Sequence, residues 1–321
     1  MTISNNRNIN CVNCDTNNFN IFSKYYHGRR LNIKKILICN NCNLKQVDFI
    51  PNNEKLKSFY NDINTKLLFD TNENYSNHPT FNSFDSYLEF IILKTKINTT
   101  DKLNVIDIGA GNGRTLLQVK NLTKWNILGI EPDKIKCKIL DFLKLNYINE
   151  IFQNLDSKLK DNNYDLIIIS QVLEHISNPL DLLKRIHSKL KPNGYLWIDV
   201  PLCNKNYFSS RSIDDVGHLY FFDEHSLSNL IKGCNFEIIG SGSFGKKIKS
   251  KRGIISSFLL FFKYYLHMYM LLYLLNLRKK LKKNDKDLKI SDIKNSFNKE
   301  NIKIEENNFE NSKLFFLVKK N

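Results

Sequence analysis

The chain has 321 residues, of which 42% are hydrophobic and 25% charged, so its composition is that of a globular protein and excludes a disordered chain. That length accommodates one large domain and a smaller appendage. The formal net charge of +16 is typical of nucleic-acid-binding proteins. However, residues 246–286 alone hold twelve Lys or Arg and one Asp, so most of the surplus belongs to one segment. We therefore expect no nucleic-acid partner.

The beginning of the sequence and its cysteines indicate a cellular compartment. No apolar secretory segment opens the sequence, and the seven cysteines are an odd number. Disulfides are therefore not expected, and the pattern favours the reducing cytoplasm.

Four cysteines near the start form two C-x-x-C pairs, Cys11/Cys14 and Cys39/Cys42, with 24 residues between them. Each pair places two thiolates on one tight turn, and two pairs complete a tetrahedral site that suits a structural Zn²⁺ ion. Residues 19–26 and 33–39 are predicted to form the intervening hairpin. The alternatives are free thiols or a site that has lost its metal. We assign 1–52 to a zinc-binding module and 53–321 to a second domain.

The second domain contains a glycine-rich turn between a predicted strand and a predicted helix. Apolar residues 105–106 precede it, and Gly109, Gly111 and Gly113 alternate along it. Glycines let the backbone approach a ligand closely, and the following helix offers free N–H groups and its positive dipole end. Asp107 precedes the first glycine by two residues, which distinguishes this turn from the G-x-G-x-x-G of dinucleotide sites.

Further predicted elements alternate between strand and helix. Residues 125–130 form a strand that ends before Glu131, where an acid can bind the two hydroxyls of a ribose. Residues 164–169 are almost continuously apolar, as in a buried parallel strand. Asn178-Pro179 is typical of a helix start, and residues 195–200 form the next strand. The order predicts an α/β fold with a doubly wound sheet.

Three stretches carry a family resemblance: VIDIGAGNGRTL, GIEPD and YDLIIISQVLEHISNPLDLLKRIHSKLKPNGYLWIDVP. Residues 103–240, roughly, resemble class I S-adenosylmethionine (SAM)-dependent methyltransferases. The resemblance implies an enzyme with a seven-stranded sheet that uses SAM. It implies that Gly109 and Gly111 line the methionine part of SAM, that Asp107 lies beneath it and that Glu131 holds the ribose. The remaining expected SAM contacts are Gly113, Asn154 (against the adenine) and Ser170.

The stretch after the fifth strand, Gly217-His218-Leu219-Tyr220-Phe221-Phe222, resembles the glycan-type members of this family. Some sugar methyltransferases, including C-methyltransferases, also carry a short amino-terminal zinc module. Both features imply a saccharide acceptor, such as a nucleotide sugar or a lipid-linked or surface glycan. We expect O-methylation with His218 as the base, because a near-neutral imidazole can take a hydroxyl proton. Alternatively, His218 only hydrogen-bonds a loop. His175 is expected to shape the pocket.

Other functions remain open from the sequence. They are sugar C-methylation, RNA or protein methylation, and a non-catalytic scaffold that binds SAM. The intact glycines and Glu131 argue against loss of SAM binding.

A long insertion separates the sixth predicted strand, 235–240, from the seventh, 313–318. Within it, residues 246–305 are predicted to be helical, and the apolar stretch Ile254–Leu277 lies between basic clusters. This pattern suits contact of residues 246–286 with an anionic membrane surface, peripheral to the inner face. A lid and a dimer interface are the alternatives, while Lys263 near the middle disfavours a spanning helix.

Overall fold

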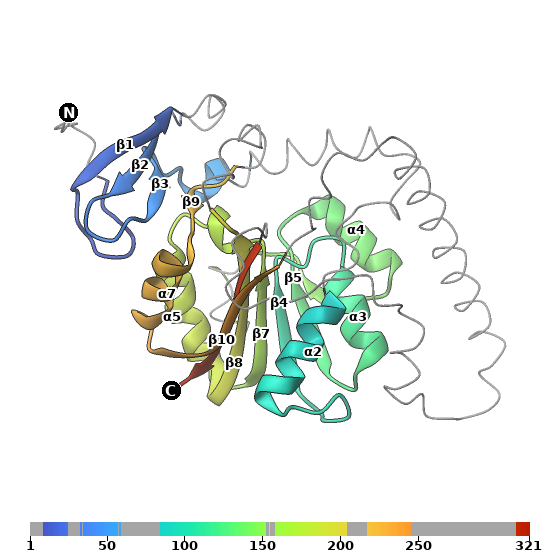
Figure 1. The fold of residues 1–321 in the computed structure, drawn as a ribbon. Helices are drawn as coiled ribbons and strands as arrows, with labels where there is room; N and C mark the ends of the chain where they lie inside the picture. The colour runs from blue at the N-terminus through green and yellow to red at the C-terminus, as the bar shows by residue number, and fades with distance from the viewer. Residues whose placement is uncertain are drawn as a thin grey trace, which may run out of the picture.

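The computed structural model describes residues 9–24, 33, 35–56, 58, 84–151, 154, 158–203, 217–244 and 313–321 (Figure 1). The predicted helical insertion at 246–305, with its predicted membrane contact, lies outside these residues. No helix in the described ranges is long and apolar enough to cross a membrane.

The large domain is built on a sheet of seven strands in the order β10-β11-β8-β7-β4-β5-β6. The strands from β8 to β6 run parallel, and β11 lies antiparallel between β8 and β10. The predicted seven-stranded α/β sheet is therefore confirmed. The strands are β4 (Asn104–Ile108), β5 (Asn126–Ile130), β6 (Tyr147–Ile148), β7 (Tyr164–Ser170), β8 (Leu190–Pro201), β10 (Phe236–Phe244) and β11 (Lys313–Lys320).

Helices cover both faces of this sheet (Figure 1). The apolar run in strand β7 reflects burial on both faces of the sheet: Leu166 and Ile168 pack into one core cluster, and Ile167 and Ile169 pack into the other. Such burial on both faces explains the absence of alternation. One face carries α2 (Phe84–Thr95), α3 (Arg114–Leu122) and α4 (Lys134–Phe142), and the other carries α5 (Pro179–Lys189) and α7 (Glu224–Lys232).

Helix α5 begins as its sequence predicts, because the Asn178 side chain accepts a hydrogen bond from the Asp181 amide. Strand β8 differs from the prediction and begins at Leu190 rather than Tyr195. Its pairing with β7 shifts between the Tyr164–Leu190 pair and the Leu166–Tyr195 pair. The turn-forming residues 191–194 therefore lie in an irregularity inside the strand.

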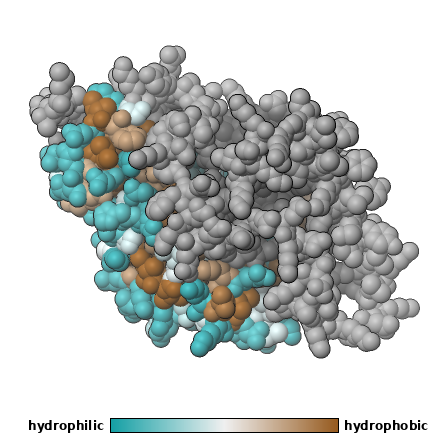
Figure 2. All heavy atoms as spheres, in the orientation of Figure 1, coloured by the Kyte–Doolittle hydropathy of each residue, from teal (hydrophilic) through white to brown (hydrophobic). Residues whose placement is uncertain are grey.

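The amino-terminal module is a small antiparallel sheet of β1 (Phe19–Lys24), β2 (Lys35–Cys39) and β3 (Lys45–Val47). The predicted hairpin is present, and Phe19 pairs with Cys39. The fourth strand of this sheet, β9 (Tyr220–Phe221), comes from the large domain. Hydrophilic and apolar residues intersperse on the outer surface of the module in Figure 2. A division at residue 52 thus separates segments that share one sheet.

Candidate active site and cysteine cluster

The glycine turn after β4 is held against the end of β5. The amides of Gly109 and Ala110 both donate to the carbonyl of Ile130, at 2.8 and 3.0 Å. Gly109 has a φ of +74°, and a Cβ there would meet Val172 at 2.4 Å. Gly111 has a φ of +55°, but the nearest atom to a Cβ there is 3.9 Å away. Val172 therefore packs against the turn at Gly109, whereas the turn leaves room for a ligand at Gly111.

The Glu131 side chain lies directly beside this turn and is only 3% exposed. Its carboxylate accepts from the Gly111 amide at 2.7 Å and from the Asp133 amide at 2.9 Å. Asp133 in turn caps α4 by accepting from the Ile135 amide. The structure thus brings together Glu131, which is predicted to bind the ribose, and Gly111, which is predicted to line the methionine part of SAM.

Three acids are buried at this edge of the sheet. Burial, followed by the charges of Glu131 and Asp199, raises the pKa of Asp107 to about 8. Burial also raises the pKa of Glu131 and of Asp199, although Gln171 and Trp197 donate to the Asp199 carboxylate. A group of buried acids favours a cationic ligand, and SAM carries a sulfonium and an ammonium. The residues present therefore fit SAM.

The other expected SAM contacts have distinct environments. A Cβ at Gly113 would lie 2.5 Å from Leu140 and 2.6 Å from Leu145, so this glycine lets α3 pack closely. Ser170, at the end of β7, pairs with Asp199 and hydrogen-bonds its carboxylate. Asn154 is exposed and donates to Glu150 at 3.1 Å. Contact of these three residues with SAM stays a prediction.

On the side where the sequence predicts the acceptor, three polar side chains converge around the short helix η4 (Leu173–His175). Oε1 of Glu174 lies 3.7 Å from Nε2 of His175 and 3.8 Å from Nε2 of His218. The two imidazole rings are 4.6 Å apart. Glu174, which the sequence prediction missed, is 1% exposed. Its one signal was its place beside His175 in L-E-H, directly after a strand that ends at the ligand edge.

Burial governs protonation in this group. It raises the pKa of Glu174 to about 8 and lowers the pKa of His175 to about 4, against the opposing effect of the Gly217 carbonyl. At neutral pH the isolated protein therefore holds a largely protonated acid next to a neutral imidazole.

The segment that carries His218 is held from two sides. The Leu219 amide donates to the Glu174 carbonyl at 2.8 Å, and the Leu219 carbonyl accepts from the Val47 amide of β3 at 3.0 Å. Strand β9 follows, and the Tyr220 hydroxyl donates to the Ser177 carbonyl at 2.9 Å. The amino-terminal module thus forms one wall that positions the His218 segment.

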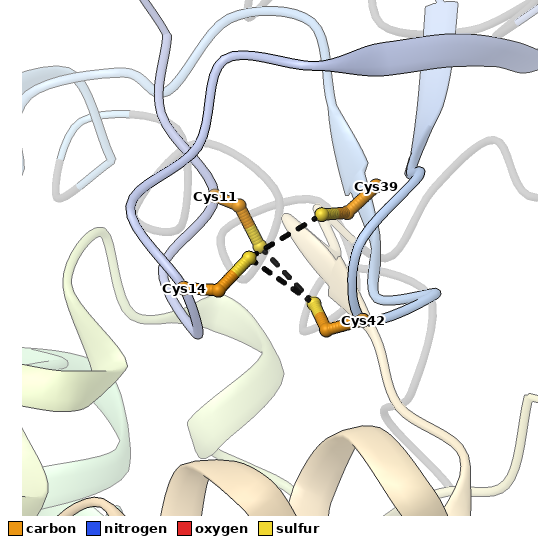
Figure 3. Close-up of side chains that lie close together, drawn as sticks. All are labelled: Cys11, Cys14, Cys39 and Cys42. Carbon is orange, nitrogen blue, oxygen red and sulfur yellow. Dashed lines mark hydrogen bonds between the residues drawn. The ribbon is translucent and has the colours of Figure 1, made fainter.

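The four predicted zinc ligands form a compact cluster (Figure 3). The Sγ atoms lie 3.4 Å apart for Cys11 and Cys42, 3.5 Å for Cys14 and Cys39, and 3.7 Å for Cys14 and Cys42. Four sulfurs bound at about 2.3 Å to one zinc ion lie roughly 3.8 Å apart. The cluster therefore has nearly the dimensions of a tetrahedral zinc site.

The thiols respond unequally to this crowding. Burial raises the pKa of Cys11, and it raises the pKa of Cys42 to about 11. Burial acts in the same direction on Cys39, but hydrogen bonds from the Cys42 and Asn41 amides outweigh it and lower the pKa. Amides that donate to sulfur stabilise the thiolate, which is the form that binds a metal.

Residues 72–240, more than half of the chain, match the family described as "Methyltransferase domain". The chain belongs to this methyltransferase family. It is a class I SAM-dependent methyltransferase, as its sheet order and glycine turn indicate.

Its relatives act on different acceptors. A tRNA U34 carboxymethyltransferase of Campylobacter fetus is 30% identical over 125 residues, which cover 36% of this chain and 42% of the relative. A ubiquinone biosynthesis O-methyltransferase of Rickettsia prowazekii is 30% identical over 115 residues, covering 33% and 44%. This methyltransferase thus spans less than half the length of either relative.

Among solved structures, the plantazolicin methyltransferase BpumL in complex with SAH shares the fold. Its TM-score is 0.51 and its sequence identity is 18%, over 83% of this chain and 93% of BpumL.

Proposed function

We propose that this methyltransferase transfers the methyl group of SAM to a hydroxyl of a saccharide. The observation that carries the proposal is the position of the His218 segment, which is bonded to Glu174 of the domain core and to Val47 of the module. Paired C-x-x-C turns ahead of a SAM domain, followed by G-H-L-Y-F-F, resemble sugar methyltransferases in sequence. A nucleotide sugar or a lipid-linked glycan is the proposed acceptor.

The residues at the glycine turn are proposed to hold SAM. Gly111 gives room for the methionine part, Glu131 exchanges its amide partners for the ribose hydroxyls, and Asp107 supplies negative charge beneath. Gly109, Gly113, Ser170 and Asn154 complete the proposed set. When bound, SAM supplies a methyl group on a good leaving group, so the protein mainly has to align the acceptor and exclude water.

His218 is proposed to act on the acceptor. A neutral imidazole nitrogen would accept the hydroxyl proton as the acceptor oxygen bonds to the methyl carbon, while the bond between that carbon and the SAM sulfur breaks and S-adenosylhomocysteine leaves. Replacement of His218 by Ala should lower turnover by about 100-fold or more with SAM affinity nearly unchanged. Unchanged turnover on the true substrate would leave His218 with only a structural role.

The four cysteines are proposed to hold one structural zinc ion. The sulfur spacing supports this, because it nearly equals the edge of a tetrahedral zinc–thiolate site. Elemental analysis of protein purified without chelators should find about one zinc per chain.

Methyl transfer to tRNA is the second candidate function, and the similarity to the tRNA U34 carboxymethyltransferase of C. fetus favours it. The deciding experiment incubates the protein with labelled SAM and separate panels of nucleotide sugars, lipid-linked sugars and tRNA. Label in a sugar fraction supports the first proposal, and label in tRNA alone overturns it.

A further inference from the structure

We propose that Glu174, His175 and His218 bind a divalent metal ion on the acceptor side, separate from the cysteine cluster. Within the described part of the chain, two groups of potential ligands converge, and these three residues form the second. Their ligand atoms all lie within 4.8 Å of one another. Two imidazoles and one carboxylate are a common ligand set for first-row transition metals.

The first observation is the state of the Glu174 carboxylate. It is 1% exposed, and neither oxygen has a hydrogen-bond partner among the described residues. A buried carboxyl group without hydrogen-bond partners is energetically unfavourable, so native proteins compensate such groups with hydrogen bonds, a counter-charge or a metal ion.

The second observation is the orientation of His175. Its Nδ1 lies 3.3 Å from the Gly217 carbonyl oxygen, which can only accept, so Nδ1 carries the proton. In neutral His175, Nε2 then carries a lone pair, and this lone pair faces Glu174. Metal-binding histidines commonly donate their other N–H to a backbone carbonyl in this way.

The third observation is the spacing. A protonated carboxyl that donates to an imidazole lies at about 2.7 Å, which is much shorter than the 3.7 and 3.8 Å observed. Two ligand atoms bound to one ion at about 2.1 Å, at tetrahedral or trigonal angles, lie roughly 3.4–3.6 Å apart. The observed distances exceed the upper end of this range by only about 0.1 and 0.2 Å.

The electrostatics of the surroundings agree. Asp199 is a second buried acid whose charge acts on Glu174, and Lys313 opposes it. A cation would reach the site from the side of His175. The His175 side chain is 19% exposed, while those of Glu174 and His218 are nearly buried. In the metal-bound protein His218 would contact the acceptor through the ion instead of as a free base.

Binding of Ni²⁺ tests this site, because imidazole ligands suit that ion. Untagged protein that carries one zinc ion per chain is titrated with Ni²⁺ by calorimetry, and bound nickel and zinc are then counted by elemental analysis. Wild type should bind one Ni²⁺ and keep its zinc. Replacement of Glu174 by Gln or of His218 by Asn should weaken Ni²⁺ binding about 10- to 100-fold. The control His225→Ala removes an exposed histidine of α7 and should bind like wild type.

Unchanged SAM affinity shows that each variant is folded. If Glu174→Gln loses SAM binding, His175→Gln takes its place, since that side chain is partly exposed. Equal Ni²⁺ affinity in wild type and the cluster variants, or no Ni²⁺ binding at all, would overturn the proposal. Neither result changes the His218→Ala turnover test or the acceptor panel, so this site and the proposed function fail separately.

Discussion

The glycine turn and the His218 segment differ in where their support comes from. The hydrogen bonds of the turn come from residues 109–133, which run from the end of β4 through α3 and β5 to the N-cap of α4, and Val172 packs against Gly109. The His218 segment is bonded to η4 on one side and to β3 of the amino-terminal module on the other. The proposed cofactor side should therefore survive damage to the module, whereas the proposed acceptor side should not.

Loss of the cysteine cluster is the strongest test of this contrast. In Cys39→Ser we expect zinc to be lost, because one of its four ligands is removed. The module should then unfold, because structural zinc supplies much of the folding free energy of such modules. Without β2 and β3 in place, the His218 segment loses its outer wall, and methyl transfer should fall by about 100-fold or more. SAM affinity should change little. Zinc content, methyl transfer and calorimetric SAM binding measure the three effects.

Cys234→Ser is the matched control. Cys234 is a buried thiol outside the cluster, and its sulfur lies 3.8 Å from the Leu180 carbonyl. This variant should keep both zinc and transfer. A Cys39→Ser protein that lacks zinc but transfers methyl groups normally would show that the acceptor side does not depend on the module.

Gly111→Val should have the reverse effect. A valine at a φ of +55° is strained, and its side chain would occupy the space proposed for the methionine part of SAM. We expect SAM affinity to fall about 100-fold, which is about 2.7 kcal/mol. Zinc content should not change.

The control for this variant is Gly233→Ala, because Gly233 has an ordinary φ of −63° and a Cβ there would meet nothing closer than 3.4 Å. That variant should bind SAM normally. Wild-type affinity in Gly111→Val would move the proposed cofactor site elsewhere.

A change of pH should alter SAM affinity less than Gly111→Val does. Burial raises the pKa of Asp107 to about 8, so the folded protein without SAM keeps this proton at neutral pH, whereas the unfolded chain releases it near 4. This group thus makes the protein less stable as pH rises from about 4 to 8. Cationic SAM favours the ionised carboxylate, so binding should release a proton, and affinity should rise by up to about tenfold per pH unit below pH 8.

Calorimetry in buffers with different ionisation enthalpies counts the released proton. Asp107→Asn cannot release it, so its affinity should vary less with pH. Equal slopes in wild type and Asp107→Asn would show that Asp107 is not coupled to the cofactor.

The arrangement of the proposed cofactor side could largely be predicted because its signals are local. The glycines, Asp107 and Glu131 fall within 25 consecutive residues, and they lie at or after the end of a strand that is recognisable from its apolar residues. The cysteine cluster was predictable for the same reason, since each C-x-x-C pair sets half of the site.

The arrangement of the proposed acceptor side could be predicted only in part. Residues 174 and 218 are 44 positions apart, and no periodicity indicates that their side chains meet. Strand β9 has two residues and exists only because β3 offers it an edge. In β8 the K-P-N-G sequence is typical of a helix end, but the strand begins before it and pairs with β7 on both sides of it. Tertiary contacts decided all three, and local propensity does not contain them.

A pair of tyrosine variants tests the contrast at its smallest scale. The Tyr220 hydroxyl, on β9, donates to the Ser177 carbonyl at 2.9 Å, and Tyr220 is 3% exposed. Tyr220→Phe removes this bond and leaves a partly buried carbonyl unpaired, so the free energy of unfolding should fall by about 1 kcal/mol. The hydroxyl of Tyr147, on β6, donates a hydrogen bond of the same length to Asp141 of α4, but in an exposed position. Tyr147→Phe should therefore lower the free energy of unfolding by less than about 0.5 kcal/mol.

Denaturant unfolding measures both values, and KM for the acceptor should rise in Tyr220→Phe alone. Equal costs, or a KM that changes in both variants, would mean that the hydroxyl of Tyr220 does not help to position the His218 segment.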